Sequence, residues 1–154
     1  MSDYRIVEDD LTGPEVAALL ELHLGEMHQW SPACKVHAMP LERLRQPDVT
    51  FYSAWDNGTL AAVGALKHLG ENRGELKSMR AAPAYRGKGA GKAILEHLIA
   101  EARAWRADAL QLSVFSENFG AQRFYQRYGF RKVADIDFWV GNHRDDEFLY
   151  ELAL

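Results

Sequence analysis

Two apolar runs joined by a short polar turn constrain the fold of this chain more than any other feature. The runs cover residues 50–55 and 60–69, and Asp56-Asn57-Gly58 separates them. Asn-Gly tolerates the positive φ angles of a tight hairpin turn, so the sequence predicts two antiparallel strands connected at this point. The chain is therefore expected to contain an antiparallel sheet.

The other segments alternate between strand and helix patterns. Gly13-Pro14 is a typical helix start, and the apolar residues after it recur at helical spacing. Further strands are predicted at residues 4–8, 75–82, 110–115, 130–133 and 147–152, and further helices at residues 41–45, from near 89, and at 118–128, the last capped by Gly129. This order indicates an α+β or mixed α/β sheet fold, with residues 1–154 forming one domain.

Charge and composition exclude several classes of function. The formal net charge of −4 argues against nucleic-acid binding, and no apolar run reaches the length of a membrane span, so we expect a cytoplasmic protein. Cys34 is the only cysteine, and the six histidines show no metal-ligand spacing, so no metal is expected. Residues 77–92 nevertheless carry five basic side chains and no acidic one, which suggests a site for a small polyanion.

Within this basic stretch, a glycine-rich turn connects a predicted strand to a predicted helix. It reads Arg86-Gly87-Lys88-Gly89-Ala90-Gly91-Lys92. Glycines let the backbone approach an anion closely, and the unpaired N–H groups at a helix start attract phosphate oxygens. The turn is therefore predicted to bind a phosphate group.

Two common phosphate-binding motifs do not fit this turn. In a Walker A loop a Ser or Thr follows the Gly-Lys pair, whereas Ala93 stands there and Arg86 occupies the place of the first glycine. A dinucleotide-binding fingerprint belongs early in a βαβ unit, but this turn follows a hairpin.

Two motifs resemble those of the GNAT acetyltransferases. Ala81-x-Pro83 followed by Arg86-x-x-Gly89-x-Gly91 is similar to motif A of that family. The segment Asn118-x-x-Ala121-x-x-Phe124-Tyr125-x-x-Tyr128-Gly129-Phe130 is similar to motif B, in the expected order downstream. The resemblance covers roughly residues 50–152 and implies a mostly antiparallel central sheet flanked by helices.

The resemblance implies that acetyl-CoA is bound and that its acetyl group is transferred to an amine. The backbone from Arg86 to Lys92 would bind the pyrophosphate, and the strand near Met79–Ala81 would pair with the pantetheine arm and supply an N–H to the oxyanion. Asn118 and Tyr125 would lie near the pantetheine and the thioester, with Tyr125 as general acid. The implied cofactor-binding residues are Met79, Arg80, Ala81, Arg86, Gly87, Lys88, Gly89, Ala90, Gly91, Lys92, Asn118 and Tyr125. Simpler roles are also open: Asn118 is a good helix N-cap, and Tyr125 fits an apolar helix face.

Direct transfer to an amine also requires deprotonation. An alkylammonium with a pKa near 10.4 is neutral in only about one molecule in 2,500 at pH 7, a cost of roughly 4.6 kcal/mol. Glu75 is the candidate base, because it begins the strand that leads into motif A, where several GNAT enzymes carry a catalytic glutamate. An ordinary solvated acid at this position, with another residue or water as base, is the alternative.

The acceptor is the least determined part of the site. In the family, the N-terminal helices and the loop before the last strand shape the acceptor pocket, which indicates residues 30–39 and 138–147, with Trp30 and His37 as candidate contacts. We expect a small-molecule amine. A protein or peptide amine, or a non-catalytic acyl-CoA sensor, are the alternatives, and a homodimer is an open option.

Overall fold

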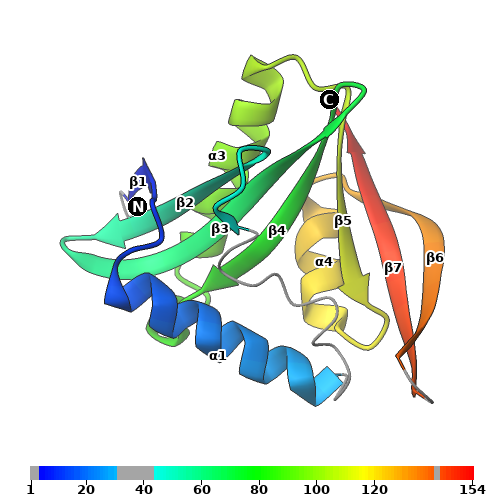
Figure 1. Ribbon diagram of the computed structural model, residues 1–154, viewed down its shortest axis with the longest axis horizontal. Coiled ribbons are helices and arrows are strands. Elements are labelled where there is room, and N and C mark those ends of the chain that lie inside the picture. The colour runs from blue at the N-terminus through cyan, green and yellow to red at the C-terminus, as the bar shows by residue number, and fades with distance from the viewer. Residues whose placement is uncertain (1–3, 31–43, 141–142) are drawn as a thin grey trace.

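The computed structural model describes residues 4–30, 44–140 and 143–154, and its framework is a seven-stranded sheet with helices on both faces (Figure 1). The strands are β1 (Arg5–Glu8), β2 (Val49–Asp56), β3 (Thr59–Gly70), β4 (Arg73–Ala81), β5 (Ala109–Phe115), β6 (Arg131–Val140) and β7 (His143–Ala153). The helices are α1 (Pro14–Trp30), the 3-10 turn η2 (Pro83–Tyr85), α3 (Ala90–Ala104) and α4 (Phe119–Arg127).

The strand order is β1-β2-β3-β4-β5-β7-β6. Neighbouring strands are antiparallel except β4 and β5, which run parallel. The predicted mixed, mostly antiparallel sheet is therefore confirmed. The parallel pair is possible because α3 provides the long connection that parallel strands need.

The hairpin predicted at Asp56-Asn57-Gly58 is confirmed. Asn57 has φ 49° and Gly58 has φ 86°, and Asp56 pairs with Thr59 across the two-residue turn. Positive φ at both central residues is the geometry of a turn whose twist matches that of the strands. Other local signals were also read correctly, since Pro14 begins α1 and Gly129 follows α4 with φ 93°.

Two hydrophobic clusters pack on opposite faces of the sheet. One includes Ile94, Leu95 and Leu98 of α3 together with Leu76, Leu110 and Tyr125. The other includes Val16, Leu19 and Leu20 of α1 together with Phe51 and Val63. Figure 1 shows α1 crossing one face of the sheet while α3 and α4 lie on the other.

The sheet splits between β4 and β5. The two strands pair only at Arg73–Glu75, opposite Ala109–Gln111, and then diverge (Figure 1). Beyond Glu75, β4 remains paired with β3 and β5 remains paired with β7. The second half of β4 therefore has main-chain groups on its β5 side that no described strand pairs with.

A β-bulge lies in the same half of β4. The register with β3 shifts between the pairs Val63–Arg80 and Ala65–Lys77, and Ser78 has φ 55°. Gly64 faces this irregularity, where an added Cβ would lie 2.7 Å from the Met79 sulfur. A bulge bends the strand and increases its twist, which helps β4 to turn away from β5.

Two sequence predictions need correction or fall outside the structure. The segment 138–147 was expected to be a loop, but β6 extends to Val140 and β7 begins at His143, since the last two strands are longer than predicted. The helix predicted at residues 41–45 lies largely outside the described residues; Leu44, which is described, is helical.

Candidate active site

The glycine-rich turn forms an exposed loop before α3. Gly87 and Gly89 have φ of 74° and 82°, a conformation that glycine adopts at little cost. The first bond of the helix runs from Ala93 N–H to the Gly89 carbonyl at 2.9 Å. The four preceding N–H groups, from Gly89 to Lys92, consequently have no acceptor within the helix. Gly87, Lys88 and Gly89 are exposed, and a Cβ at either left-handed glycine would meet no atom within 4 Å, so the loop has open space for an anion beside these N–H groups.

Tyr125 lies on α4, beside the start of α3. Its side chain is only 9% exposed and packs edge-to-face against Phe124 and Phe130, with ring centroids 5.2 and 5.6 Å apart. A Cβ placed on Gly91 would lie 3.8 Å from the Phe124 ring, which shows how closely α4 flanks the loop. Burial raises the pKa of Tyr125 well above its usual value, so the phenol is protonated at neutral pH.

Asn118 caps the N-terminus of α4. Its side-chain oxygen accepts a hydrogen bond from Ala121 N–H at 3.2 Å. The capping role predicted from residue type is therefore confirmed. This bond uses the oxygen of the carboxamide and leaves its NH2 group out of the cap.

Glu75 lies at the point where β4 and β5 separate. Its carboxylate is 2.7 Å from Lys77 Nζ and accepts a hydrogen bond from Gln111 Nε2 at 3.0 Å. Because Leu76 packs in the cluster with α3, strand alternation places Glu75 on the opposite face of the sheet. The structure therefore places Tyr125 and Glu75 on opposite faces of the sheet, and not in a single cluster.

Gln111 also connects Glu75 to a wider polar network. Arg73 Nη2 lies 3.3 Å from the Gln111 side-chain oxygen and forms an ion pair with Glu151 on β7. Neither Gln111 nor Lys77 was predicted as a site residue. Lys77 has a sequence signal, since it lies two positions from Glu75 and so faces the same side of the strand, whereas Gln111 depends on a pairing register that sequence spacing does not show.

Residues 16–130 match the model of the acetyltransferase (GNAT) family. The chain belongs to this family. As a GNAT member, it is an acyl-CoA-dependent N-acetyltransferase.

Similar proteins agree with this assignment. The chain is 41% identical to the uncharacterized N-acetyltransferase YsnE of Bacillus subtilis, over 80% of this chain and 83% of that protein. It is 40% identical to the uncharacterized N-acetyltransferase YedL of Escherichia coli, over 82% and 81%. A shorter segment, 35% of this chain and 36% of the relative, is 42% identical to the spermine/spermidine N(1)-acetyltransferase of Bacillus subtilis.

The fold is also that of solved GNAT structures. A GNAT acetyltransferase from Elizabethkingia anophelis, crystallised with acetyl-CoA bound, superposes with a TM-score of 0.75 at 18% identity and covers all of both chains. At this identity the similarity establishes the fold alone.

The remaining predicted residues of this GNAT chain are placed unevenly. Met79, Arg80 and Ala81 lie on β4 beyond the split; Arg80 and Ala81 pair with β3, and Met79 packs against the cluster that contains α3. His37 lies outside the described residues. Trp30 is the last residue of α1, and its side chain is not among those described.

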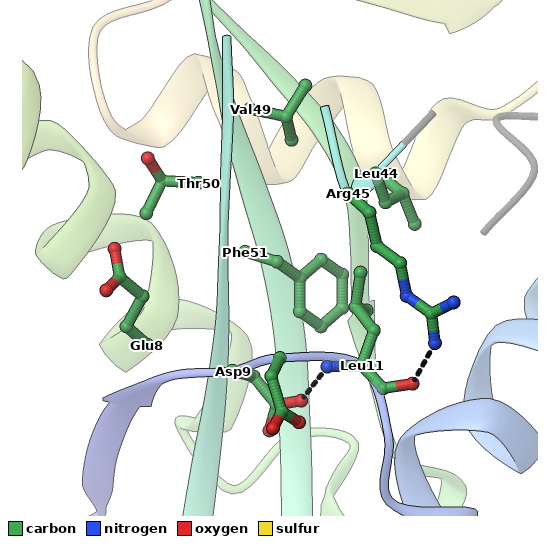
Figure 2. Close-up of a pocket in the computed structure, with 9 residues that line it drawn as sticks. Glu8, Asp9, Leu11, Leu44, Arg45, Val49, Thr50 and Phe51 are labelled. Atoms are coloured by element: carbon green, nitrogen blue, oxygen red, sulfur yellow. Dashed lines mark hydrogen bonds between the residues drawn. The ribbon is translucent and has the colours of Figure 1, made fainter. Parts of the chain in front are cut away.

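A separate cavity of about 390 Å³ lies at the β1–β2 edge (Figure 2). Asp9 on its wall accepts hydrogen bonds from Leu11 N–H at 2.8 Å and Ser53 Oγ at 2.6 Å, and Arg45 donates to the Leu11 carbonyl at 3.0 Å. Because Asp9 and Arg45 form hydrogen bonds within the chain, we interpret them as stabilising the β1–β2 edge of the sheet and not as binding a ligand. None of the predicted site residues that the structure describes lines it.

Within the described part of the chain, none of the helices has the length and apolar character needed to span a bilayer.

Proposed function

We propose that this protein transfers the acetyl group of acetyl-CoA to a primary amine of a small molecule. The observation that supports this most is the split between β4 and β5. It ends beside a helix start whose N–H groups have no helical acceptor. Acetyl-CoA has a group that would fit each feature: its amide-containing arm would fit the split, and its diphosphate would fit the helix start.

The loop residues would hold the diphosphate. The N–H groups from Gly89 to Lys92 would donate hydrogen bonds to it. The positive end of the α3 dipole lies at the same helix start and would also attract it. Arg86, Lys88 and Lys92 are exposed around the same loop and add positive charge. The residues present therefore fit an anionic group of this kind.

The split edge of β4 would hold the pantetheine arm. Residues 76–81 lie beyond the last pairing with β5, so their main chain on that side can bond to an extended amide-containing chain as to another strand. A thioester positioned there would lie between the face of α3 and α4, which carries Tyr125, and the face that carries Glu75.

The two faces suggest separate roles in the reaction. The neutral nitrogen attacks the thioester carbonyl, a C–N bond forms, the C–S bond breaks, and the proton that the nitrogen then loses balances the released thiolate. Before this step the acceptor ammonium must lose its first proton, because only the neutral amine is a nucleophile. Glu75, with its carboxylate ordered by Lys77 and Gln111, would accept that proton directly or through water. The acceptor would then approach from the α1 face.

Tyr125 would act on the departing sulfur from the other face. The thiol of the leaving group has a pKa near 8.5, so the thiolate can depart without complete proton transfer from Tyr125. The protonated phenol, held in an apolar setting, would stabilise the developing negative charge as a hydrogen-bond donor.

The acceptor class is proposed on narrower grounds. The segment of 55 residues that matches the spermine/spermidine N(1)-acetyltransferase shows that part of the chain is similar to an enzyme named for small polyamines. Glu75 and the formal net charge of −4 would favour a cationic acceptor. We therefore propose a small cationic amine.

The test is calorimetry with acetyl-CoA, followed by thiol release with a panel of polyamines, amino acids and short peptides. We expect binding that Gly89→Asp abolishes, because it places bulk and negative charge at the diphosphate. Thiol release should be fastest with a polyamine. Release only with peptides would contradict the small-molecule acceptor, and acetyl-CoA binding without release with any amine would favour a sensor.

A further inference from the structure

The residue before β1 contacts the glycine-rich loop through a hydrogen bond. Tyr4 Oη donates to the Lys88 carbonyl oxygen at 2.7 Å, although the two residues lie 84 positions apart. No motif in the sequence identifies Tyr4, and the proposed reaction does not use it.

The position of Tyr4 is determined by the sheet and by a second tyrosine. Arg5 pairs with Trp55, so Tyr4, which directly precedes β1, comes near Asp56, the last residue of β2 at the tip of the β2–β3 hairpin. Tyr85 Oη donates to Asp56 Oδ2 at 2.8 Å, and the Tyr85 ring packs edge-on against the Tyr4 ring with centroids 6.1 Å apart. These contacts hold the Tyr4 hydroxyl beside the loop.

The bond to Lys88 has a consequence for the next residue. In a trans peptide, the carbonyl of Lys88 and the N–H of Gly89 lie in one plane and point in opposite directions, and the described residues contain no cis peptide. Holding the carbonyl on one side therefore turns the Gly89 N–H toward the other side. This N–H is the first of the four at the start of α3.

Without that bond, the peptide between Lys88 and Gly89 has an alternative orientation. Gly89 has φ 82°, and glycine adopts positive and negative φ with similar ease, so this peptide can flip. A flipped peptide would direct a carbonyl oxygen at the anion in place of a donor. The hydrogen bond from Tyr4 opposes the flip.

We propose that Tyr4 is a positioning residue for diphosphate binding, which keeps the Gly89 N–H directed at the ligand through the Lys88 carbonyl. The inference rests on the proposed function for the identity of the ligand. It predicts that the hydroxyl of Tyr4 contributes to affinity for the diphosphate portion of CoA and to no other portion.

The test compares the wild-type chain with Tyr4→Phe, which removes one oxygen and retains the ring contact with Tyr85. Dissociation constants are measured for CoA, for dephospho-CoA, which keeps the diphosphate, and for pantetheine, which lacks it; NMR titration covers the weakest binding. We expect Tyr4→Phe to weaken CoA and dephospho-CoA about five- to tenfold and to leave pantetheine unchanged. Tyr52→Phe is the matched control: Tyr52 lies on β2 beside His97, in the middle of α3, and this substitution should change none of the three.

Two results would overturn the role of Tyr4: unchanged affinity for CoA, or an equal loss for all three ligands, which would indicate a general effect on the fold. If the wild-type chain binds no CoA, the proposed function fails, and the Tyr4 inference is then decided in the free protein. There, relaxation dispersion at the Gly89 amide should detect peptide flipping in Tyr4→Phe that is absent from the wild type. Identical Gly89 signals in the two proteins would overturn it.

Discussion

At the scale of single residues, Tyr125 shows how burial prepares a group for the proposed reaction. Its ring is packed between Phe124 and Phe130, and burial raises its pKa, so it is a persistent hydrogen-bond donor. We predict that Tyr125→Phe lowers kcat by about a hundredfold, within the range known for positioned proton donors. The dissociation constant for acetyl-CoA should change less than about twofold, because the ring remains in place. Steady-state kinetics and calorimetry would measure the two effects.

Tyr128→Phe is a suitable control for this substitution. Tyr128 lies next to Phe124, with ring centroids 5.3 Å apart, but is only half-buried, and the proposed reaction assigns it no role. We expect its loss of the hydroxyl to leave kcat near the wild-type value. A Tyr125→Phe enzyme with normal kcat would remove Tyr125 from the chemistry.

At the scale of elements, α4 depends on its cap at Asn118. The helix has nine residues, so one lost bond at its first turn is a large share of its stabilisation. We predict that Asn118→Ala lowers the free energy of unfolding by about 1 kcal/mol. Thermal denaturation should then show a midpoint roughly 2–4 °C lower for a chain of this size.

Asn118→Asp separates capping from ligand binding. Aspartate caps a helix as well as asparagine does, so it should restore the stability that alanine loses. It lacks the NH2 group, however, so any contact from that group to the pantetheine would stay lost. Asn118→Asp with wild-type stability but weaker CoA binding would support the proposed contact, whereas failure to restore stability would contradict the capping argument.

At the scale of the whole molecule, buried tyrosines connect the fold to alkaline pH. Burial first, and then nearby carboxylates, raise the pKa of Tyr52 to about 12, and burial raises that of Tyr125. Tyrosines in the unfolded chain ionise near pH 10. Above that pH the unfolded state binds fewer protons than the folded state, so the free energy of unfolding should fall as pH rises from about 10 to about 12.

Chemical denaturation at several pH values above and below about 10 would measure this slope. The contribution of Tyr52 is full below pH 10 and is lost as pH approaches 12. We therefore expect Tyr52→Phe to show a shallower decline than the wild type over that window. Equal slopes would mean that Tyr52 ionises in the folded protein as readily as in the unfolded chain.

Local patterns in the sequence determined much of the fold. The turn at Asn57-Gly58, the start of α1 at Pro14, the cap at Asn118 and the glycine-rich loop before α3 all depend on residues within a few positions of one another. Turn geometry, capping and helix amphipathicity act over such distances, so residue type alone predicts them. The parts of the candidate site that were predicted most securely, the loop and Asn118, are of this kind.

Only the tertiary structure decided which residues from distant parts of the chain contact one another. The parallel pairing of β4 with β5 is short, which creates the split, and its register brings Gln111 to Glu75. Glu75 and Tyr125 lie on opposite faces of the sheet. The bond from Tyr4 to Lys88 likewise joins segments that are distant in the chain. Such contacts follow from strand register and packing, which are set by the burial of whole faces and not by neighbouring residues. The sequence therefore determined the individual elements and the conformation of the loop, while the packed sheet decided which side chains meet.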